Sequence, residues 1–143
     1  VNATGAQVHG NGHMYAILDQ SVVPGRGKDA LDRLAFFTRL GYAPWADRSQ
    51  VDFSLDVGFT GSGFRPADQW GAALTYTSFT GSFISALAAA GGYSTSGEST
   101  LEMTYKAQLS PWCSLQPTLQ YVMHPQDGPP HATVLGLVLN VTF

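Results

Sequence analysis

The chain has 143 residues, the length of about one domain, and a formal net charge of −3 at neutral pH. Only 12% of its residues are charged, against about 25% in an ordinary soluble domain, whereas 12% are aromatic and 16 are glycine. This composition excludes a disordered chain and a coiled coil, which both carry far more charge, and the acidic balance argues against a nucleic-acid partner.

The first half of the chain predicts strands, because apolar and polar residues alternate along it. The alternation is clearest over residues 51–60, where Phe53 and Leu55 share one parity and Asp52 and Asp56 share the other. Weaker alternation of the same kind covers residues 12–23, 31–42 and 68–77.

Residues 79–98 form the one long connection, and we expect them to be a loop. Its alanine-rich centre, residues 86–90, predicts a short helix, although an eighth strand within residues 79–93 is an alternative. The second half of the chain then alternates again over residues 101–109, 114–124 and 131–143. We therefore expect about seven or eight strands in one segment, residues 1–143, with consecutive strands as antiparallel neighbours.

Two all-β architectures produce this pattern. A soluble β-sandwich hides its apolar faces against each other, whereas a transmembrane β-barrel turns them to lipid. Each predicted strand has roughly ten residues, which is longer than the five or six of most soluble strands and sufficient for a tilted strand to cross a bilayer. Aromatic residues near the strand ends, such as Trp45 and Trp112, also suit the interfacial girdles of a barrel.

A set of short motifs in a fixed order resembles one family. The motifs are Asp19–Gln20, Phe37, Arg39, Gly58, Gly63–Phe64–Arg65–Pro66, Asp68, Gly71, Leu101–Glu102, Tyr105, Gln108–Leu109, Pro111–Trp112, Leu115–Gln116–Pro117, Leu119–Gln120–Tyr121, His124–Pro125 and a terminal Phe143. The chain resembles the C-terminal part of the carbohydrate-selective outer-membrane porins, the OprB family.

The resemblance implies a fold, a function and a location. The fold is an antiparallel transmembrane β-barrel of about sixteen strands, to which this chain contributes the C-terminal portion. The function is passive, selective diffusion of mono- and small oligosaccharides across the bacterial outer membrane, with no enzymatic activity, no cofactor and no metal. The expected partners are sugars, the lipid bilayer with its lipopolysaccharide, and either further copies of the chain, as in a trimer, or the remainder of the barrel.

The same resemblance places the C-terminus on the periplasmic side. Residues 79–98 and 124–130 then form extracellular loops, and residues 61–66 and 110–113 form short periplasmic turns, in agreement with the usual asymmetry of such barrels.

Polar side chains on the strands are the candidate sugar contacts, because a sugar channel needs hydrogen-bond donors and acceptors along its wall. These lumen candidates are Arg39, Asp52, Asp56, Glu102, Lys106, Gln108, Gln116 and Gln120. Arg65 and Asp68 lie where a turn meets a strand, and form either a contact at the lumen mouth or, as we favour, a local ion pair that fixes the turn.

Two other functions fit the same strands. The chain could be a non-conducting structural or accessory segment of the outer membrane that pairs with another chain. It could also be a soluble β-sandwich that acts as a binding module.

Overall fold

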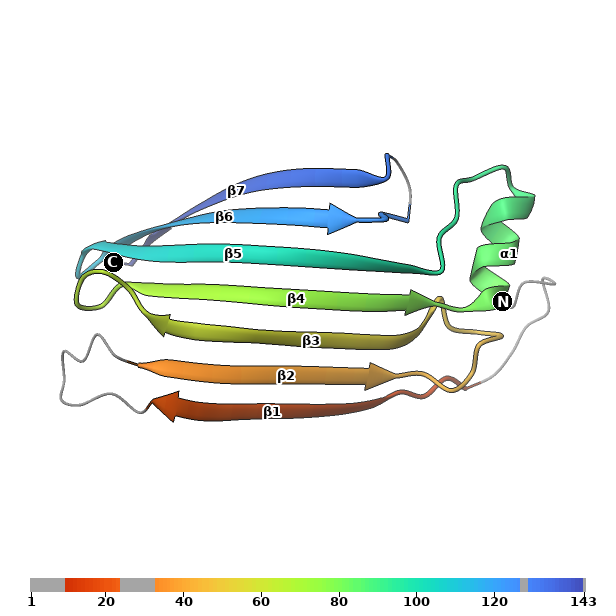
Figure 1. Cartoon of the computed structure of the whole chain (residues 1–143), viewed down its shortest axis with the longest axis horizontal. Coiled ribbons are helices and arrows are strands. Elements are labelled where there is room, and N and C mark those ends of the chain that lie inside the picture. Colours follow the sequence, from red (N-terminus) through yellow and green to blue (C-terminus); the bar gives the residue numbers. More distant parts are fainter. Residues whose placement is uncertain (1–9, 24–32, 127–128, 143) are drawn as a thin grey trace.

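A computed structural model describes residues 10–23, 33–126 and 129–142 of the chain. Its strands form one antiparallel sheet in which the spatial order follows the sequence (Figure 1). The elements are β1 (Met14–Val23), β2 (Leu34–Tyr42), β3 (Val51–Ser62), β4 (Gln69–Phe79), α1 (Gly81–Ala89), β5 (Gly97–Ser110), β6 (Cys113–Met123) and β7 (His131–Val141).

The seven strands confirm the strands that the alternation predicts. The largest difference is at β5, which begins at Gly97, four residues earlier than expected. The possible eighth strand within residues 79–93 is wrong, because this segment contains the helix α1. Thr80 explains where α1 begins, since its side chain caps the helix by accepting a hydrogen bond from the Phe83 N–H.

Cross-strand register gives the sheet two unlike faces. Leu40 of β2 lies opposite Leu55 of β3, on what we call the apolar face. One residue along each strand, Arg39 lies opposite Asp56, on what we call the polar face. Because side chains alternate strictly between the two faces, this register assigns every paired residue of the sheet to one of them.

The apolar face is the more exposed one, which is the reverse of a soluble domain. In β5, Leu101 is 44% exposed and Met103 is 55% exposed, whereas the alternating Glu102 and Thr104 are half-buried. Among the described residues other than glycine and proline, Ala43 is the only buried apolar one. These residues form one sheet, whereas a sandwich needs a second sheet to cover the apolar face.

The sheet is open, with β1 and β7 at its two edges (Figure 1). The structure thus shows the antiparallel all-β arrangement, and closure into a barrel stays a prediction.

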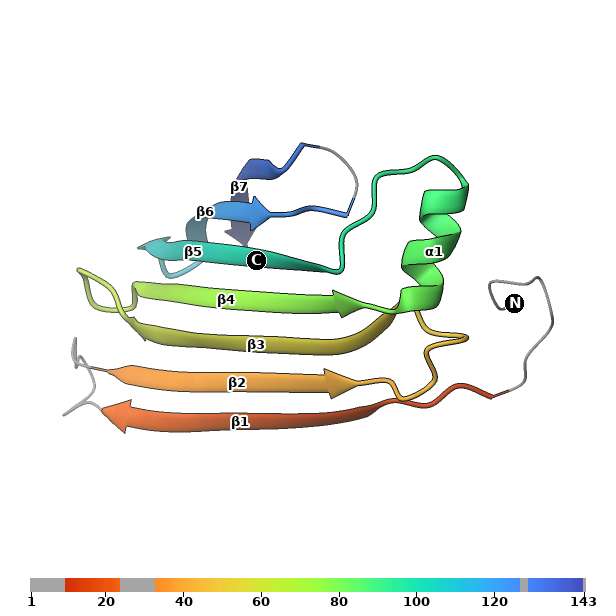
Figure 2. The ribbon, with the colours of Figure 1, turned by 45° about the vertical axis from the view of Figure 1, so that its right-hand side comes forward.

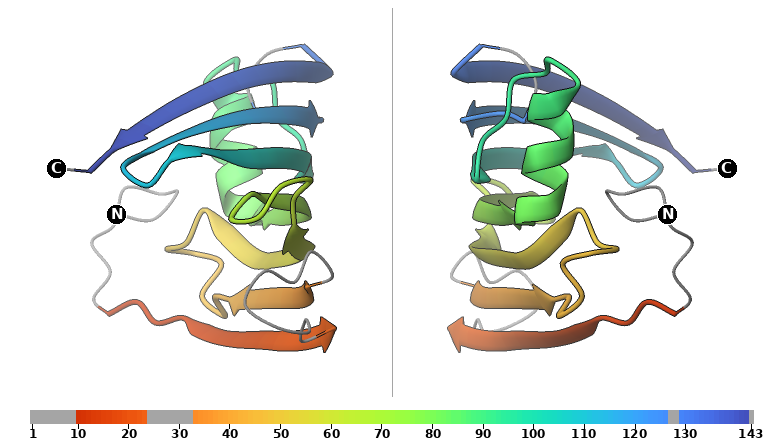
Figure 3. Two further views of the ribbon diagram at one scale, coloured as in Figure 1. Left: turned by 90° about the vertical axis from the view of Figure 1, so that its left-hand side faces the viewer. Right: turned by 90° about the vertical axis from the view of Figure 1, so that its right-hand side faces the viewer.

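Among the connections from β2 onward, the longer ones lie at one end of the sheet and the shorter ones at the other. The end with the β2–β3 loop, α1 and the β6–β7 loop is called the loop end here, and the end with the β3–β4 and β5–β6 turns is called the turn end. Figures 2 and 3 show that α1 lies across the loop end and does not cover either face of the sheet. In the described part of the chain, no helix is both long and apolar enough to span a membrane.

Hydrogen bonds fix the connections at the loop end. Thr80 is fully buried, and its hydroxyl donates to the Ser49 carbonyl oxygen over 2.7 Å, while its N–H donates to the Gln50 carbonyl oxygen over 2.9 Å. The Ser82 hydroxyl also donates to the Ala46 carbonyl oxygen. The beginning of α1 is therefore attached to the β2–β3 loop.

Candidate functional site

The polar face brings together most of the candidate sugar contacts. Register places Arg39 opposite Asp56, and Glu102 opposite Gln120. Lys106 lies opposite Gln69, and Gln116 lies opposite Val138. Asp52 lies at a bulge at the loop end of β3, and Gln108 lies at the turn end of β5.

An aromatic ring lies beside Arg39 on this face. The guanidinium carbon of Arg39 is 5.3 Å from the centroid of the Phe37 ring, which is within cation–π range. The ring also lies over the backbone of β3, because a Cβ atom on Gly58 would come within 2.6 Å of the Phe37 Cζ atom. Gly58 therefore allows the Phe37 ring to lie close to the sheet, with the Arg39 guanidinium over it.

Sequence reasoning missed Phe37 as a site residue, although its parity could have revealed it. Phe37 shares the parity of Arg39, whereas Phe36 lies on the apolar face and packs against Phe59 with 5.3 Å between ring centroids. An aromatic residue of polar parity is unusual in such a strand and is therefore a usable signal.

Strands β5 and β6 carry a ladder of hydrogen-bonding side chains. The Gln120 amide donates to Glu102 Oε2 over 2.5 Å, and the Gln116 amide donates to the Thr104 hydroxyl over 3.0 Å. Thr104 and Thr118 also share a hydrogen bond of 3.1 Å between their hydroxyl oxygens. Successive rungs are about 7 Å apart along the strand, so the hydroxyl groups of one sugar ring could contact more than one rung.

Asp52 and Gln108 have different surroundings from the other candidates. Asp52 Oδ1 is buried and has no hydrogen-bond partner among the described residues. The Gln108 amide donates to the carbonyl oxygens of Ser110 over 2.7 Å and Cys113 over 3.3 Å. In this structure Gln108 therefore holds the β5–β6 turn, and its amide nitrogen is already occupied.

Asp68 organises the turn end of the sheet. Its carboxylate accepts hydrogen bonds from Arg65 Nε, from the Tyr105 hydroxyl and from the Gln108 N–H, each over 2.8 Å. The Tyr105 hydroxyl in turn accepts a hydrogen bond of 3.0 Å from the N–H of Phe64. Arg65, together with the Gln108 N–H and the Tyr105 hydroxyl, lowers the pKa of Asp68 to about 2.

The ion pair expected between Arg65 and Asp68 is present. It does more than fix the β3–β4 turn, because the buried Asp68 carboxylate also connects this turn to β5. Asp68 is 3% exposed, so its hydrogen bonds are protected from water.

Comparison of the chain with curated proteins and with solved structures gives no match. Comparison with protein families gives a match over residues 1–143, the whole chain, to the carbohydrate-selective porin, OprB family. The chain therefore belongs to the OprB family of carbohydrate-selective porins.

Proposed function

We propose that this chain forms part of the wall of a bacterial outer-membrane β-barrel, through which mono- and small oligosaccharides diffuse. Membership of a carbohydrate-selective porin family supports this function. The structural observation that carries it is the exposed apolar face, with half-buried polar side chains behind it. A barrel wall needs this arrangement, because its outer surface contacts lipid and its inner surface contacts water.

Aromatic side chains on the apolar face also support a sheet that crosses the membrane. Trp70 lies opposite Tyr105 near the turn end of the apolar face. Tyr42 lies opposite Phe53 near the loop end, and Tyr121 projects from the same end of β6. Two such groups, at opposite ends of the strands, match the aromatic girdles at the two interfaces of a bilayer. We further propose that the loop end, which carries α1 and the β2–β3 and β6–β7 loops, faces the exterior and that the turn end faces the periplasm.

The proposed mechanism is weak, repeated binding along the wall. A sugar exchanges hydrogen bonds with water for hydrogen bonds with the Glu102–Gln120 and Thr104–Gln116 rungs, and it contacts Phe37 together with the Arg39 guanidinium over that ring. Each exchanged hydrogen bond contributes only about 0.5–1.5 kcal/mol net, so a few of them give millimolar affinity. Such affinity favours entry and still allows rapid release. The pathway needs no cofactor and no catalytic step.

The open sheet favours one alternative. Both edges of the sheet are unpaired among the described residues, so the chain could be an accessory segment that pairs with another chain without conducting. Lipid cannot satisfy an open edge, so under either proposal β1 and β7 acquire neighbours in the membrane.

Planar-bilayer conductance tests the proposal. The native protein, purified in detergent, is expected to form a stable channel whose current falls as glucose or maltose is added. A Phe37→Ala variant should weaken this block, whereas the adjacent Phe36→Ala, on the apolar face, should leave it unchanged. Folded protein that forms no channel would refute the proposed function and favour the accessory segment.

A further inference from the structure

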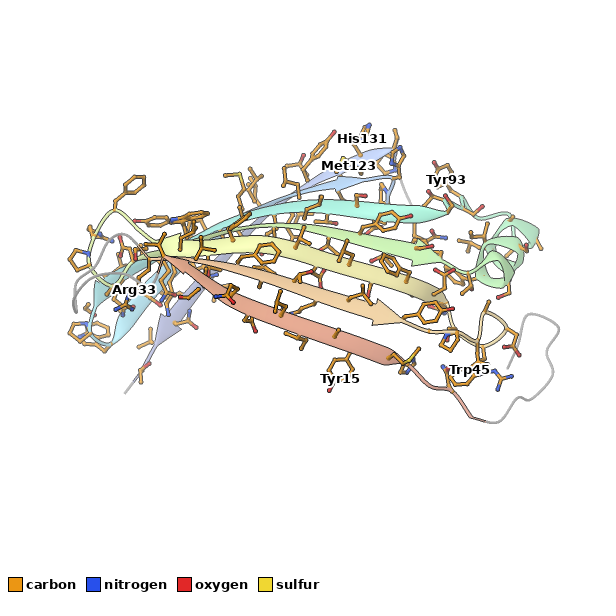
Figure 4. All side chains as sticks on the ribbon, turned by 60° about the horizontal axis from the view of Figure 1, so that its bottom comes forward. Tyr15, Arg33, Trp45, Tyr93, Met123 and His131 are labelled. Carbon is orange, nitrogen blue, oxygen red and sulfur yellow. The ribbon has the colours of Figure 1, made fainter. Side chains whose placement is uncertain are left out.

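A hollow of about 640 Å³ lies on the polar face at the turn end. Strands β1 to β6 and the β3–β4 turn all contribute to its lining. Its charged lining residues are Arg33, Arg65, Asp68 and Lys106. Figure 4 shows Arg33 at this end of the sheet, far from Tyr15 and Trp45 near the loop end.

The charges of the hollow do not balance. Asp68 and Arg65 form an ion pair of 2.8 Å, and the remaining acceptor capacity of Asp68 is used by Tyr105 and the Gln108 N–H. Arg33 and Lys106 make no ion pair with any residue that the structure describes. Within the described part of the chain, the hollow therefore carries two positive charges that no carboxylate pairs with.

The carboxylates of the polar face lie away from these two cations. Glu102, on the same strand as Lys106, is four residues nearer the loop end, about 13 Å along the strand, and is hydrogen-bonded to Gln120. Asp56 lies farther still toward the loop end, opposite Thr75 of β4. These separations exceed the screening length of about 8 Å at physiological salt. The acidic part of the polar face therefore does not neutralise the hollow.

Register sets the distance between the two cations. Ser62, Gln69 and Lys106 lie side by side across β3, β4 and β5, and the Ser62 N–H donates to the Arg33 carbonyl oxygen. Arg33 and Lys106 are thus three strand spacings apart, about 14 Å between backbones. Gly71, two residues nearer the loop end on β4, has no side chain and leaves the adjoining part of the hollow open. Two long, flexible cationic side chains can therefore approach one monosaccharide from opposite sides.

We propose that this hollow binds the anionic group of a sugar acid or sugar phosphate, so that the channel favours such sugars over neutral ones. The inference rests on the proposed channel function for its physiological meaning. Arg33 can bind a carboxylate or phosphate with two parallel hydrogen bonds, and Lys106 adds a point charge. The neighbouring Gln69, Gln116 and Thr104 can then accept or donate to the sugar hydroxyl groups.

The test compares glucose with glucuronate as blockers of single-channel current, with a glucose phosphate ester as a separate anion. For the native protein, half-maximal block should need a lower concentration of glucuronate than of glucose, and only the glucuronate value should rise with added salt. The ester distinguishes a phosphate from a carboxylate. Stronger block by the ester than by glucose shows that the hollow accepts a phosphate, and stronger block by glucuronate than by glucose shows that it accepts a carboxylate.

Variants assign the effect to the hollow. Lys106→Gln should raise the half-blocking concentration of glucuronate about three- to tenfold, a larger factor than for glucose, which lacks the anionic group. Lys106→Arg, which keeps the charge, should retain most of the glucuronate block. The control Arg48→Gln removes a cation from the β2–β3 loop at the opposite end and should leave glucuronate block unchanged.

Two failures can be told apart. A channel that glucose blocks as well as both anions do, or whose glucuronate block survives Lys106→Gln, would overturn the anion site and leave the proposed function intact. Folded protein without any channel would refute the proposed function. In that case, calorimetric titration of the detergent-purified protein with glucuronate decides, and equal heats for native protein and Lys106→Gln would overturn the site.

Discussion

At the level of single residues, Asp68 is the most connected side chain of the turn end. It is buried, it pairs with Arg65, and it accepts hydrogen bonds from Tyr105 and Gln108. A carboxylate removed from water needs such partners, since leaving it unpaired would cost the free energy of its lost hydration. The contacts to β5 make Asp68 a connection between distant parts of the chain as well as a local turn residue.

Removing the Tyr105 hydroxyl should therefore destabilise the protein. Tyr105→Phe deletes one donor to Asp68 and one acceptor for the Phe64 N–H, and we expect it to lower the free energy of unfolding by about 1–2 kcal/mol. Urea unfolding of the detergent-solubilised protein, followed by tryptophan fluorescence, measures this change. Tyr93→Phe, on the connection before β5, is the control and should stay within about 0.5 kcal/mol of the native protein. Equal effects of the two variants would contradict the role of the Tyr105 hydroxyl.

The pKa of Asp68 predicts how stability depends on pH. Because the pKa falls to about 2 in the folded protein, the unfolded chain binds the proton more readily. The stabilisation from Asp68 is therefore complete above the unfolded pKa of about 3.9 and is lost as the pH falls through about 2. Unfolding temperatures measured between pH 5 and pH 2 should decline less in Asp68→Asn than in the native protein. Parallel declines in the two proteins would show that Asp68 is not responsible.

The sequence places Arg65 and Asp68 at a turn but does not reveal their other partners. Tyr105 and Gln108 are about forty residues away from Asp68 along the chain, and only the register between β4 and β5 brings them close. The occupied amide of Gln108 could not be predicted for the same reason, since it depends on the geometry of the β5–β6 turn. By contrast, the sequence predicts that Arg39 and Asp56 lie on the polar side of their strands, because the parity of a residue along a strand decides which face its side chain occupies.

At the level of elements, period-two alternation predicts the strands because each strand has two unlike environments. The alternation reaches most strand ends, and the largest difference is at the start of β5, where residues 97–100 do not alternate. It is absent from the segment after β4, where small residues permit a helix or a strand, and tertiary contacts from Thr80 and Ser82 decide for α1. The alternation does not distinguish a sandwich from a barrel, because both have one apolar and one polar face per strand.

A pair of adjacent substitutions in β5 tests the assignment of the faces. Leu101 lies on the apolar face opposite Leu74, at the middle of β4, so Leu101→Arg should place a charge near the bilayer midplane. We expect a loss of about 2–4 kcal/mol in folding free energy in lipid. Thr100→Arg, on the polar face, should change stability by less than about 0.5 kcal/mol. Urea titration of protein refolded into lipid vesicles measures both, and a greater loss for Thr100→Arg would mean that the faces are reversed.

At the level of the whole molecule, strand directions restrict how the sheet can close. Seven consecutive antiparallel strands begin and end in the same direction, so the two edge strands, β1 and β7, are parallel to each other. An all-antiparallel barrel therefore needs an odd number of further strands between β7 and β1. Bacterial single-chain barrels have an even number of strands, which satisfies this condition. In a barrel of about sixteen strands, as the family resemblance implies, about nine strands would lie outside this sheet.

A second copy of this sheet supplies an odd number of strands, but they run in the wrong direction when both copies have their loop ends on the same side of the membrane. In that arrangement β7 of one copy would lie beside β1 of the other in parallel, a pairing that is slightly less stable than the antiparallel one and foreign to such barrels. We therefore expect each closed barrel of the native protein to hold one copy of this sheet, with antiparallel neighbours on both of its edges.

Hydrogen exchange and native mass spectrometry together test this prediction. In the native protein, the outward amides of β1 and β7 should be as protected as those of central strand β4, because further strands pair with them in a medium without water. The amides of residues 93–95, which donate no backbone hydrogen bond among the described residues, provide the unprotected reference. Rapid exchange along β1 or β7 would show that an edge stays open and would favour the accessory segment over the channel. Two copies of the sheet in one closed barrel, with both edges protected, would instead show that parallel pairing closes it.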